Sequence, residues 1–342
     1  MFLGVQVACA QCHDHPSEAW KRDQFHELAS FYGKTALRRR RDVAAQSGVP
    51  FVFEVGPAPA RKEYRKPDLK DPSKPGEMVQ PVFLSGHSIA MESDDSARRS
   101  ALAEFVVSKR NPLFARAFVN RMWAELFGRG FVTPIDDLSP QREVAAPRTF
   151  DALSKSFAAS GYDVKELLRT ILASQAYASS FAGRSSSQPA GPASVLPTRL
   201  TSDQIFDAVD WVVGQIDDGQ PDQRRRAGAR GLFRQAFGFD PSVDQAEIEG
   251  SIPQALALMN HPKLNERIQA DRAGTLLHKV LATQTNDRDV VRMLYLRTLA
   301  RKPTAAETDQ CLQYVREVGN RSEAFEDVLW ALLNSTEFLY NH

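Results

Sequence analysis

The 342-residue sequence has few cysteines, no long hydrophobic run and no excess of charge of either sign. No stretch approaches the roughly 18 uninterrupted apolar residues that a membrane-spanning helix needs, so we expect no transmembrane segment. The 43 Lys and Arg residues balance 42 Asp and Glu residues, which leaves a formal net charge of +1. We therefore expect no whole-chain attraction to anionic lipid and no nucleic-acid partner.

Signature motifs of common enzyme classes are also missing. The sequence contains no phosphate-binding loop, no G-x-G-x-x-G, no H-E-x-x-H and no recognisable Ser-His-Asp arrangement. The first residues, 1–7, are too short for the apolar core of an export signal and lack a basic start. The sequence discloses no substrate, and it leaves open whether the protein is an enzyme.

The cysteines carry the clearest chemical pattern. There are three, which is too few for a disulfide framework, and two of them form Cys9-Ala10-Gln11-Cys12-His13. C-x-x-C-H is the pattern of covalent haem attachment, in which each thiol forms a thioether with a haem vinyl group and the following imidazole binds the iron. We therefore predict that Cys9, Cys12 and His13 bind haem c, with His13 as the proximal iron ligand.

Other readings of this cluster stay open. Cys9, Cys12, His13 and His15 together supply four ligands within seven residues, a set that could hold Zn²⁺ or iron. A thioredoxin-like redox pair would need a βαβ context, which the following sequence does not show. The two cysteines could also be purely structural. If haem is bound, the candidates for its distal ligand are Met78, His87, Met91 and His26.

The hydropathy pattern predicts a mainly α protein with a small β element at about 49–84, near the N-terminus. Two β-like runs, 49–55 and 78–84, each contain a proline, which favours edge strands. The stretch between them, 57–77, is rich in proline and charge, and we interpret it as a surface loop.

From residue 93 onward the pattern is helical. Asn111-Pro112 begins one helix and Gly128 ends it, and cap-like residues at 163, 201 and 304 begin three more. Further helices are predicted near 253–270, 273–283, 287–300 and 323–334. We divide the chain into a first domain, 1–92, and a mainly helical second domain, 93–342, with a linker near 183–197.

One helix carries a polar and aromatic strip, formed by Arg116, Asn120, Trp123 and Phe127 at helical spacing. Such a strip could stack on a sugar ring and hydrogen-bond to it. It could equally be a buried structural network in which Arg116 pairs with an acid at 136 or 137. The third cysteine, Cys311, is interpreted as a small core residue, as are Met122, Met259 and Met293.

The residues 4–33, GVQVACAQCHDHPSEAWKRDQFHELASFYG, resemble the end of the planctomycete cytochrome-like domain of unknown function. The remainder resembles the planctomycete-specific domain of unknown function that usually follows it. The matching stretches lie at 114–116, 121–123, 127–130, 136–137, 160–163, 174–177, 253–260, 332–334 and 337–338.

The resemblance implies an exported protein with no established activity, from bacteria rich in sulfatases and polysaccharide-degrading enzymes. It leads us to expect a periplasmic haem c redox or electron-transfer protein that is linked to polysaccharide breakdown and is a C-terminal fragment of a longer one. Its partner would be another electron-transfer protein or a carbohydrate. The alternative is a non-enzymatic glycan- or partner-binding protein, whose Cys/His cluster is a structural Zn or Fe site.

Overall fold

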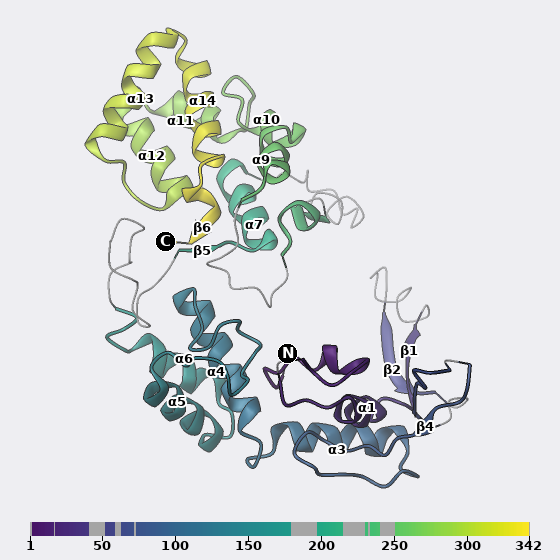
Figure 1. The fold of residues 1–342 in the computed structure, drawn as a ribbon. Coiled ribbons are helices and arrows are strands. Elements are labelled where there is room, and N and C mark those ends of the chain that lie inside the picture. The colour runs from purple at the N-terminus through teal and green to yellow at the C-terminus, as the bar shows by residue number, and fades with distance from the viewer. Residues whose placement is uncertain are drawn as a thin grey trace. The chain divides into compact units, whose positions relative to one another are not determined.

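The computed structural model describes residues 2–16, 18–40, 52–58, 63–71, 73–178, 197–214, 230–231, 233–239 and 250–341. Within these residues the chain is mainly α-helical with short strands, as the sequence predicts (Figure 1). It divides into two compact units, residues 1–126 with 130–178, and residues 179–342 with 127–129. The predicted linker at 183–197 lies outside the described residues, except for its last position.

The first unit opens with a 3-10 turn, continues with a helix and short strands, and ends in four helices. Its elements are η1 (Ala8–Gln11), α1 (Arg22–Ser30), β1 (Thr35–Arg39), β2 (Phe53–Pro57), β3 (Arg65–Lys66), β4 (Glu77–Met78), α3 (Asp95–Val107), α4 (Pro112–Phe127), α5 (Pro147–Ala159) and α6 (Val164–Leu172). β1 pairs with β2 and β3 pairs with β4, both antiparallel.

The β element begins earlier than the sequence predicts, because β1 precedes the expected range. Its partner β2 includes residues 53–55 of the run predicted at 49–55, and positions 49–51 of that run lie outside the described residues. The run predicted at 78–84 is reduced to β4 and one isolated bridge between Val82 and Ser88. The physical reason is a turn: the Gly86 amide donates to the Phe83 carbonyl and the Phe83 amide donates to the His87 carbonyl, both at 2.7 Å, so the chain reverses directly after Phe83.

The predicted helix boundaries hold where capping residues mark them. α4 lies between Asn111, whose side chain accepts from the Leu113 amide at 3.2 Å, and Gly128, whose φ is +79°. Thr201 and Thr304 each form a reciprocal capping box with the residue three positions later.

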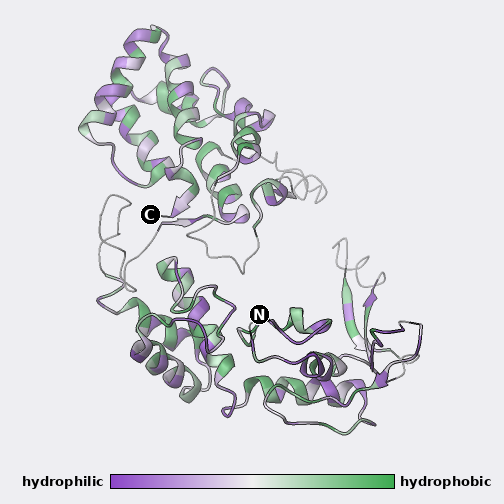
Figure 2. Ribbon diagram, viewed as in Figure 1, coloured by the Kyte–Doolittle hydropathy of each residue, from purple (hydrophilic) through white to green (hydrophobic). Residues whose placement is uncertain are grey.

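A small apolar core holds the first unit's N-terminal part together. Phe31, which follows α1, packs with Phe83 and with Leu102 of α3, and all three are buried. Phe31 and Phe83 belong to the predicted first domain, 1–92, and Leu102 to the predicted second domain, so this core combines residues of both. Figure 2 shows that hydrophobic and hydrophilic residues alternate along the helices, as expected for helices with one face packed on a core.

In its described residues the second unit is a helical bundle with one short two-stranded ladder. Its elements are β5 (Thr198–Arg199), α7 (Ser202–Val213), α9 (Ile252–Met259), α10 (Pro262–Arg267), α11 (Leu276–Thr283), α12 (Asp287–Leu299), α13 (Ala305–Val318), α14 (Arg321–Leu333), η3 (Glu337–Leu339) and β6 (Tyr340–Asn341). β5 pairs with β6, which ties the start of the unit to its end.

The core of this unit draws on α7 and on α9 to α14. Val209, Leu294 and Leu329 are fully buried in it, and Met293 and Cys311 pack against it as predicted. The single helix predicted at 253–270 is in fact two, because the proline that begins α10 has no amide hydrogen to continue α9. None of the helices in the described residues has the length and apolar character needed to cross a membrane.

Candidate functional site

The Cys/His motif forms a single 3-10 turn at the surface of the first unit. Cys9 lies within η1 and Cys12 is the residue that ends it. Both thiols are exposed and neither is in a disulfide. Between them Ala10 is fully buried, and its amide donates to the Val7 carbonyl at 3.0 Å. The turn therefore presents both sulfur atoms to solvent while its own backbone is fixed to the protein.

His13 has a defined orientation next to the turn. Its ring is exposed, and Nδ1 lies 2.7 Å from the backbone oxygen of Asp14. Because a carbonyl oxygen can only accept, Nδ1 carries the hydrogen, and in the neutral ring the lone pair is then on Nε2. Metal-bound histidines usually donate their other ring N–H to a carbonyl or carboxylate in this way. His13 is therefore in the tautomer suited to binding a metal through Nε2.

A buried histidine, His26, hydrogen-bonds to the backbone of the turn. His26 on α1 is only 1% exposed, and its Nε2 donates to the Gln11 carbonyl at 3.0 Å. Nδ1 then accepts from the Tyr64 hydroxyl at 2.8 Å. Burial, reinforced by the nearby positive charges of Arg22 and Lys66, lowers the pKa of His26 and keeps the ring neutral. Both nitrogens of His26 are occupied, so it is not available as the distal ligand considered for haem.

Asp14 connects the motif to the first turn of α1. Its Oδ1 accepts from the Arg22 amide at 3.0 Å, and its Oδ2 accepts from Lys21 Nζ at 3.0 Å. The hydrogen bond from the Arg22 amide, followed by that from Lys21, lowers the pKa of Asp14. The carboxylate thus stabilises the positive end of the helix dipole, and this fixes the carbonyl on which His13 depends.

His15, the fourth ligand of the zinc or iron alternative, has a structural role. Its Nδ1 accepts from the Glu18 amide at 3.0 Å, and its own amide donates to the Trp20 carbonyl at 2.8 Å. Among the described residues, no group of three or more His, Cys, Asp and Glu side chains is arranged to hold a metal ion.

The remaining distal-ligand candidates occupy different places in the first unit. Met78 is in β4 and about half exposed. His87 Nδ1 lies 2.9 Å from the Ser85 hydroxyl, and its ring packs against Phe105 at a centroid distance of 5.6 Å. Met91 is half-buried and its carbonyl accepts a hydrogen bond from the Arg98 guanidinium.

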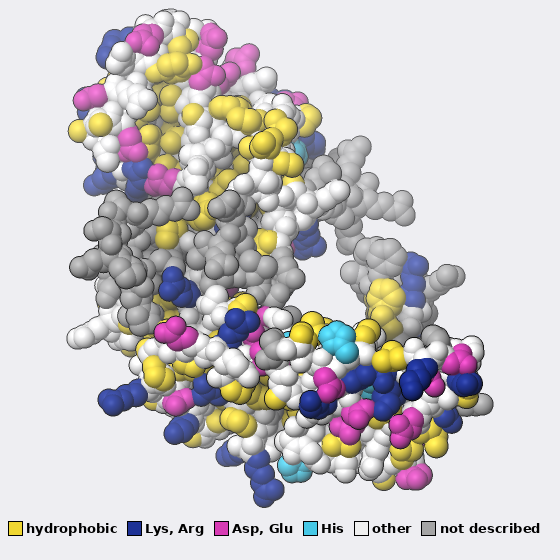
Figure 3. Space-filling model, viewed as in Figure 1, with side chains coloured by type: hydrophobic (Ala, Val, Ile, Leu, Met, Phe, Trp, Pro, Cys, Tyr) yellow, Lys and Arg dark blue, Asp and Glu magenta, His cyan; other side chains and the backbone are white. Residues whose placement is uncertain are grey.

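Basic and acidic side chains alternate on the surface of the first unit (Figure 3). Lys66 of β3 pairs with Asp23 of α1 at 2.6 Å, and this hydrogen bond is the main reason that the pKa of Lys66 is raised. Arg22 donates to the Pro67 carbonyl at 2.6 Å. These contacts attach the segment around 64–67 to α1, although the sequence predicts a surface loop over 57–77.

Arg98 of α3 is a buried arginine that the sequence does not reveal. It is fully buried, pairs with Glu63 at 2.5 Å and donates to the Ser30 carbonyl at 3.0 Å. Glu63 also pairs with Lys34 at 2.6 Å, and these two cations lower the pKa of Glu63 even though burial opposes them. The network fixes the residue that precedes Tyr64, and so supports the contact with His26.

The strip on α4 is a structural network. Arg116 forms an ion pair with Asp151 of α5 and lies over the Phe150 ring at 4.3 Å, so the expected pairing with position 136 or 137 is wrong. Asn120 is fully buried and makes three hydrogen bonds, of 2.9 to 3.0 Å, to the backbone of Val132 and Ile135. Trp123 and Phe127 are also buried. The strip therefore offers no exposed aromatic face to a sugar.

Two family models match parts of the chain, and both are described as proteins of unknown function. Residues 98–232 match the PSD1 model, described as a protein of unknown function (DUF1553), and residues 1–36 match the PSCyt2 model, described as a protein of unknown function (DUF1549). These are the two kinds of planctomycete domain that the sequence resembles. No curated protein and no solved structure is significantly similar to the chain.

Proposed function

We propose that the protein binds haem c covalently through Cys9 and Cys12, with His13 as the proximal iron ligand, and that it acts as an exported redox or electron-transfer protein. The single observation that carries this proposal is the geometry of His13. Its Nδ1 hydrogen is directed to the Asp14 carbonyl at 2.7 Å, so its Nε2 lone pair is available to iron.

The two thiols supply the attachment chemistry. Each S–H adds across one vinyl double bond, so that a C–S bond forms, the hydrogen passes to the neighbouring carbon, and no oxidant or reductant is consumed. Both thiols are exposed in one short turn, which supports this proposal because it leaves them accessible to the vinyl groups. The haem, when bound, would supply one-electron exchange between ferrous and ferric iron.

The rest of the site keeps the motif in place. His26 holds the Gln11 carbonyl in the middle of the turn, and Asp14 anchors the following residues to α1. The redox role and the export both rest on the attachment chemistry. Thioether formation needs reduced thiols and haem brought together by dedicated machinery, and the resemblance leads us to expect that machinery outside the cytoplasmic membrane. A link to polysaccharide breakdown belongs to the same proposal.

The test is a reduced pyridine-haemochrome spectrum of the full chain, produced with an export signal in a host that carries c-type maturation. A c-type band is expected in the natural sequence and in Cys311→Ser, and it should be lost in Cys9→Ser/Cys12→Ser. Circular dichroism should show unchanged helix content in all three proteins.

A colourless protein that contains stoichiometric zinc or iron by elemental analysis would overturn the haem proposal. That result would favour the alternative of a glycan- or partner-binding protein with a Cys/His metal site, although His15 Nδ1 would then have to give up its hydrogen bond with the Glu18 amide.

A further inference from the structure

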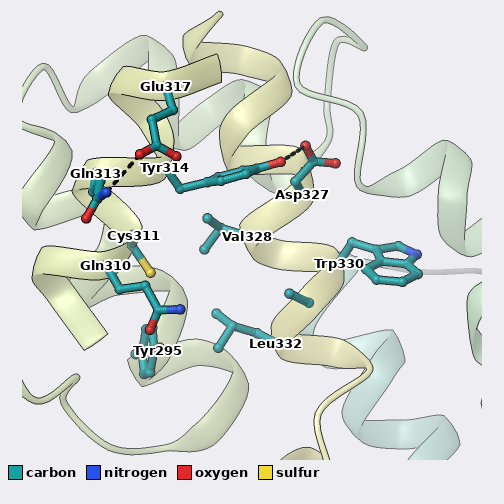
Figure 4. A pocket seen from close by; sticks show the side chains of 11 residues that line it. Tyr295, Gln310, Cys311, Gln313, Tyr314, Glu317, Asp327, Val328, Trp330 and Leu332 are labelled. Carbon is teal, nitrogen blue, oxygen red and sulfur yellow. Dashed lines mark hydrogen bonds between the residues drawn. The ribbon is translucent and has the colours of Figure 1, made fainter. Parts of the chain in front are cut away.

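A cavity of about 830 Å³ lies in the second unit, between α13 and α14 and beside α12 (Figure 4). Its size is within the range of small-molecule sites, about 300–1,000 Å³. All of its lining residues belong to this unit, so it is a feature independent of the Cys/His motif.

Apolar and aromatic side chains form one part of the cavity lining. Tyr295 of α12 and both Val328 and Leu332 of α14 are less than a tenth exposed, while the Tyr314 ring of α13 lies across the opposite side (Figure 4). Cys311 of α13 also lines the cavity, and burial raises the pKa of its thiol. These walls would bury the hydrocarbon part of a ligand at about 25 cal/mol for each Å² removed from water.

Two carboxylates lie at the rim. Asp327 Oδ2 accepts from the Tyr314 hydroxyl at 2.7 Å, and Glu317 Oε1 accepts from Gln313 Nε2 at 2.8 Å. Each acid therefore has one oxygen held in place and a second that is not engaged in a hydrogen bond or ion pair with the described residues. No Lys or Arg is among the residues that line the cavity. The rim thus carries two negative charges and no lining Lys or Arg, and it disfavours anionic ligands.

We propose that this cavity binds a small organic cation, with an ammonium group attached to an apolar body. The ammonium is held by Asp327 and by the face of the Tyr314 ring, which attracts cations, and Glu317 adds a second negative charge at the rim. The apolar body is enclosed by Val328 and Leu332. Charge and shape together select this class over neutral polyols and over carboxylates of the same size.

Cys311 provides a direct readout of occupancy. In the Cys9→Ser/Cys12→Ser background it is the protein's sole thiol, and its reaction with the neutral disulfide 4,4′-dithiodipyridine can be followed at pH 8. This background also removes the proposed haem site, so the result is independent of the haem proposal. Three probes of one shape are compared: benzylammonium, benzyl alcohol and benzoate. Glucose serves as the neutral polyol.

Benzylammonium at millimolar concentration should slow the labelling of Cys311 more than benzyl alcohol does, and benzoate should have the least effect. Asp327→Asn with Glu317→Gln should weaken the binding of benzylammonium by about two- to fivefold, as expected for rim charges that are open to water, and leave benzyl alcohol unchanged. Asp289→Asn, an exposed acid of α12 that does not line the cavity, is the matched control and should change nothing.

Equal protection by all three aromatic probes would show that charge does not select the ligand, and would overturn the proposal. Protection by glucose without protection by benzylammonium would overturn it in favour of a polyol site. The absence of protection by every probe would show that the cavity is not a binding site for this class.

Discussion

The substitution His26→Leu is expected to destabilise the turn that carries the Cys/His motif by about 2–4 kcal/mol. Leucine keeps much of the buried volume but removes both hydrogen bonds of the ring. The Gln11 carbonyl and the Tyr64 hydroxyl each lose the partner that now lies at 3.0 and 2.8 Å. An unpaired buried polar group costs about 1–3 kcal/mol. Arg22 Nε, at 3.4 Å from the same carbonyl, offsets part of the first loss.

The effect is local, so hydrogen exchange over residues 7–12 is the appropriate measurement. Tyr64→Phe alone should cost about 1 kcal/mol, and the double variant should cost less than the sum of the two single variants, because it leaves no unpaired hydroxyl. His87→Gln, at a surface histidine outside this contact, is the control. The reasoning would be refuted by unchanged exchange of residues 7–12 in His26→Leu, or by strictly additive costs.

Three further outcomes follow from the same structure. Burial lowers the pKa of His26, so as the pH falls the unfolded chain is protonated at this residue before the folded chain is. The free energy of unfolding of the first unit should therefore fall as the pH drops below about 6.5, by at most about 1.4 kcal/mol per pH unit. Urea unfolding of His26→Leu should lack this pH dependence. Asn120→Ala removes three buried hydrogen bonds and should cost about 3 kcal/mol or more in the same assay. The hydrogen bond from Arg301 lowers the pKa of Glu307 to about 2. The stabilisation that Glu307 provides is therefore present above about pH 4.5 and is lost as the pH falls through about 2. In Arg301→Gln, an NMR titration should show the pKa of Glu307 rising toward its usual value.

The helices were predictable because the information that defines them is local. The apolar spacing of α4 lies between Asn111 and Gly128, and Thr304 and Glu307 mark the first turn of α13 within four residues. The break between α9 and α10 was missed although Pro262 was visible, because the apolar pattern continues across it. The missing amide hydrogen of Pro262 ends the helix even though the apolar spacing continues beyond it.

The contacts that support the candidate site were not predictable, because their partners are distant in sequence. Tyr64 lies 38 residues from His26, in a stretch whose composition resembles an exposed loop. The acid nearest to Arg116 in space is Asp151, 35 residues away, although acids at 136 and 137 are closer in sequence. The cysteine spacing predicts the chemistry that we propose for the turn, whereas the tautomer of His13 follows only from the position of the Asp14 carbonyl.

The measurement that tests the haem proposal most directly is the mass of the tryptic peptide that ends at Lys21 and contains both Cys9 and Cys12. The protein is exported in a host with c-type maturation, denatured, and digested under conditions that release non-covalent haem. The account predicts that this peptide carries the additional mass of one haem and that neither of its thiols can be alkylated. A peptide of unmodified mass, with both thiols alkylated, would contradict it.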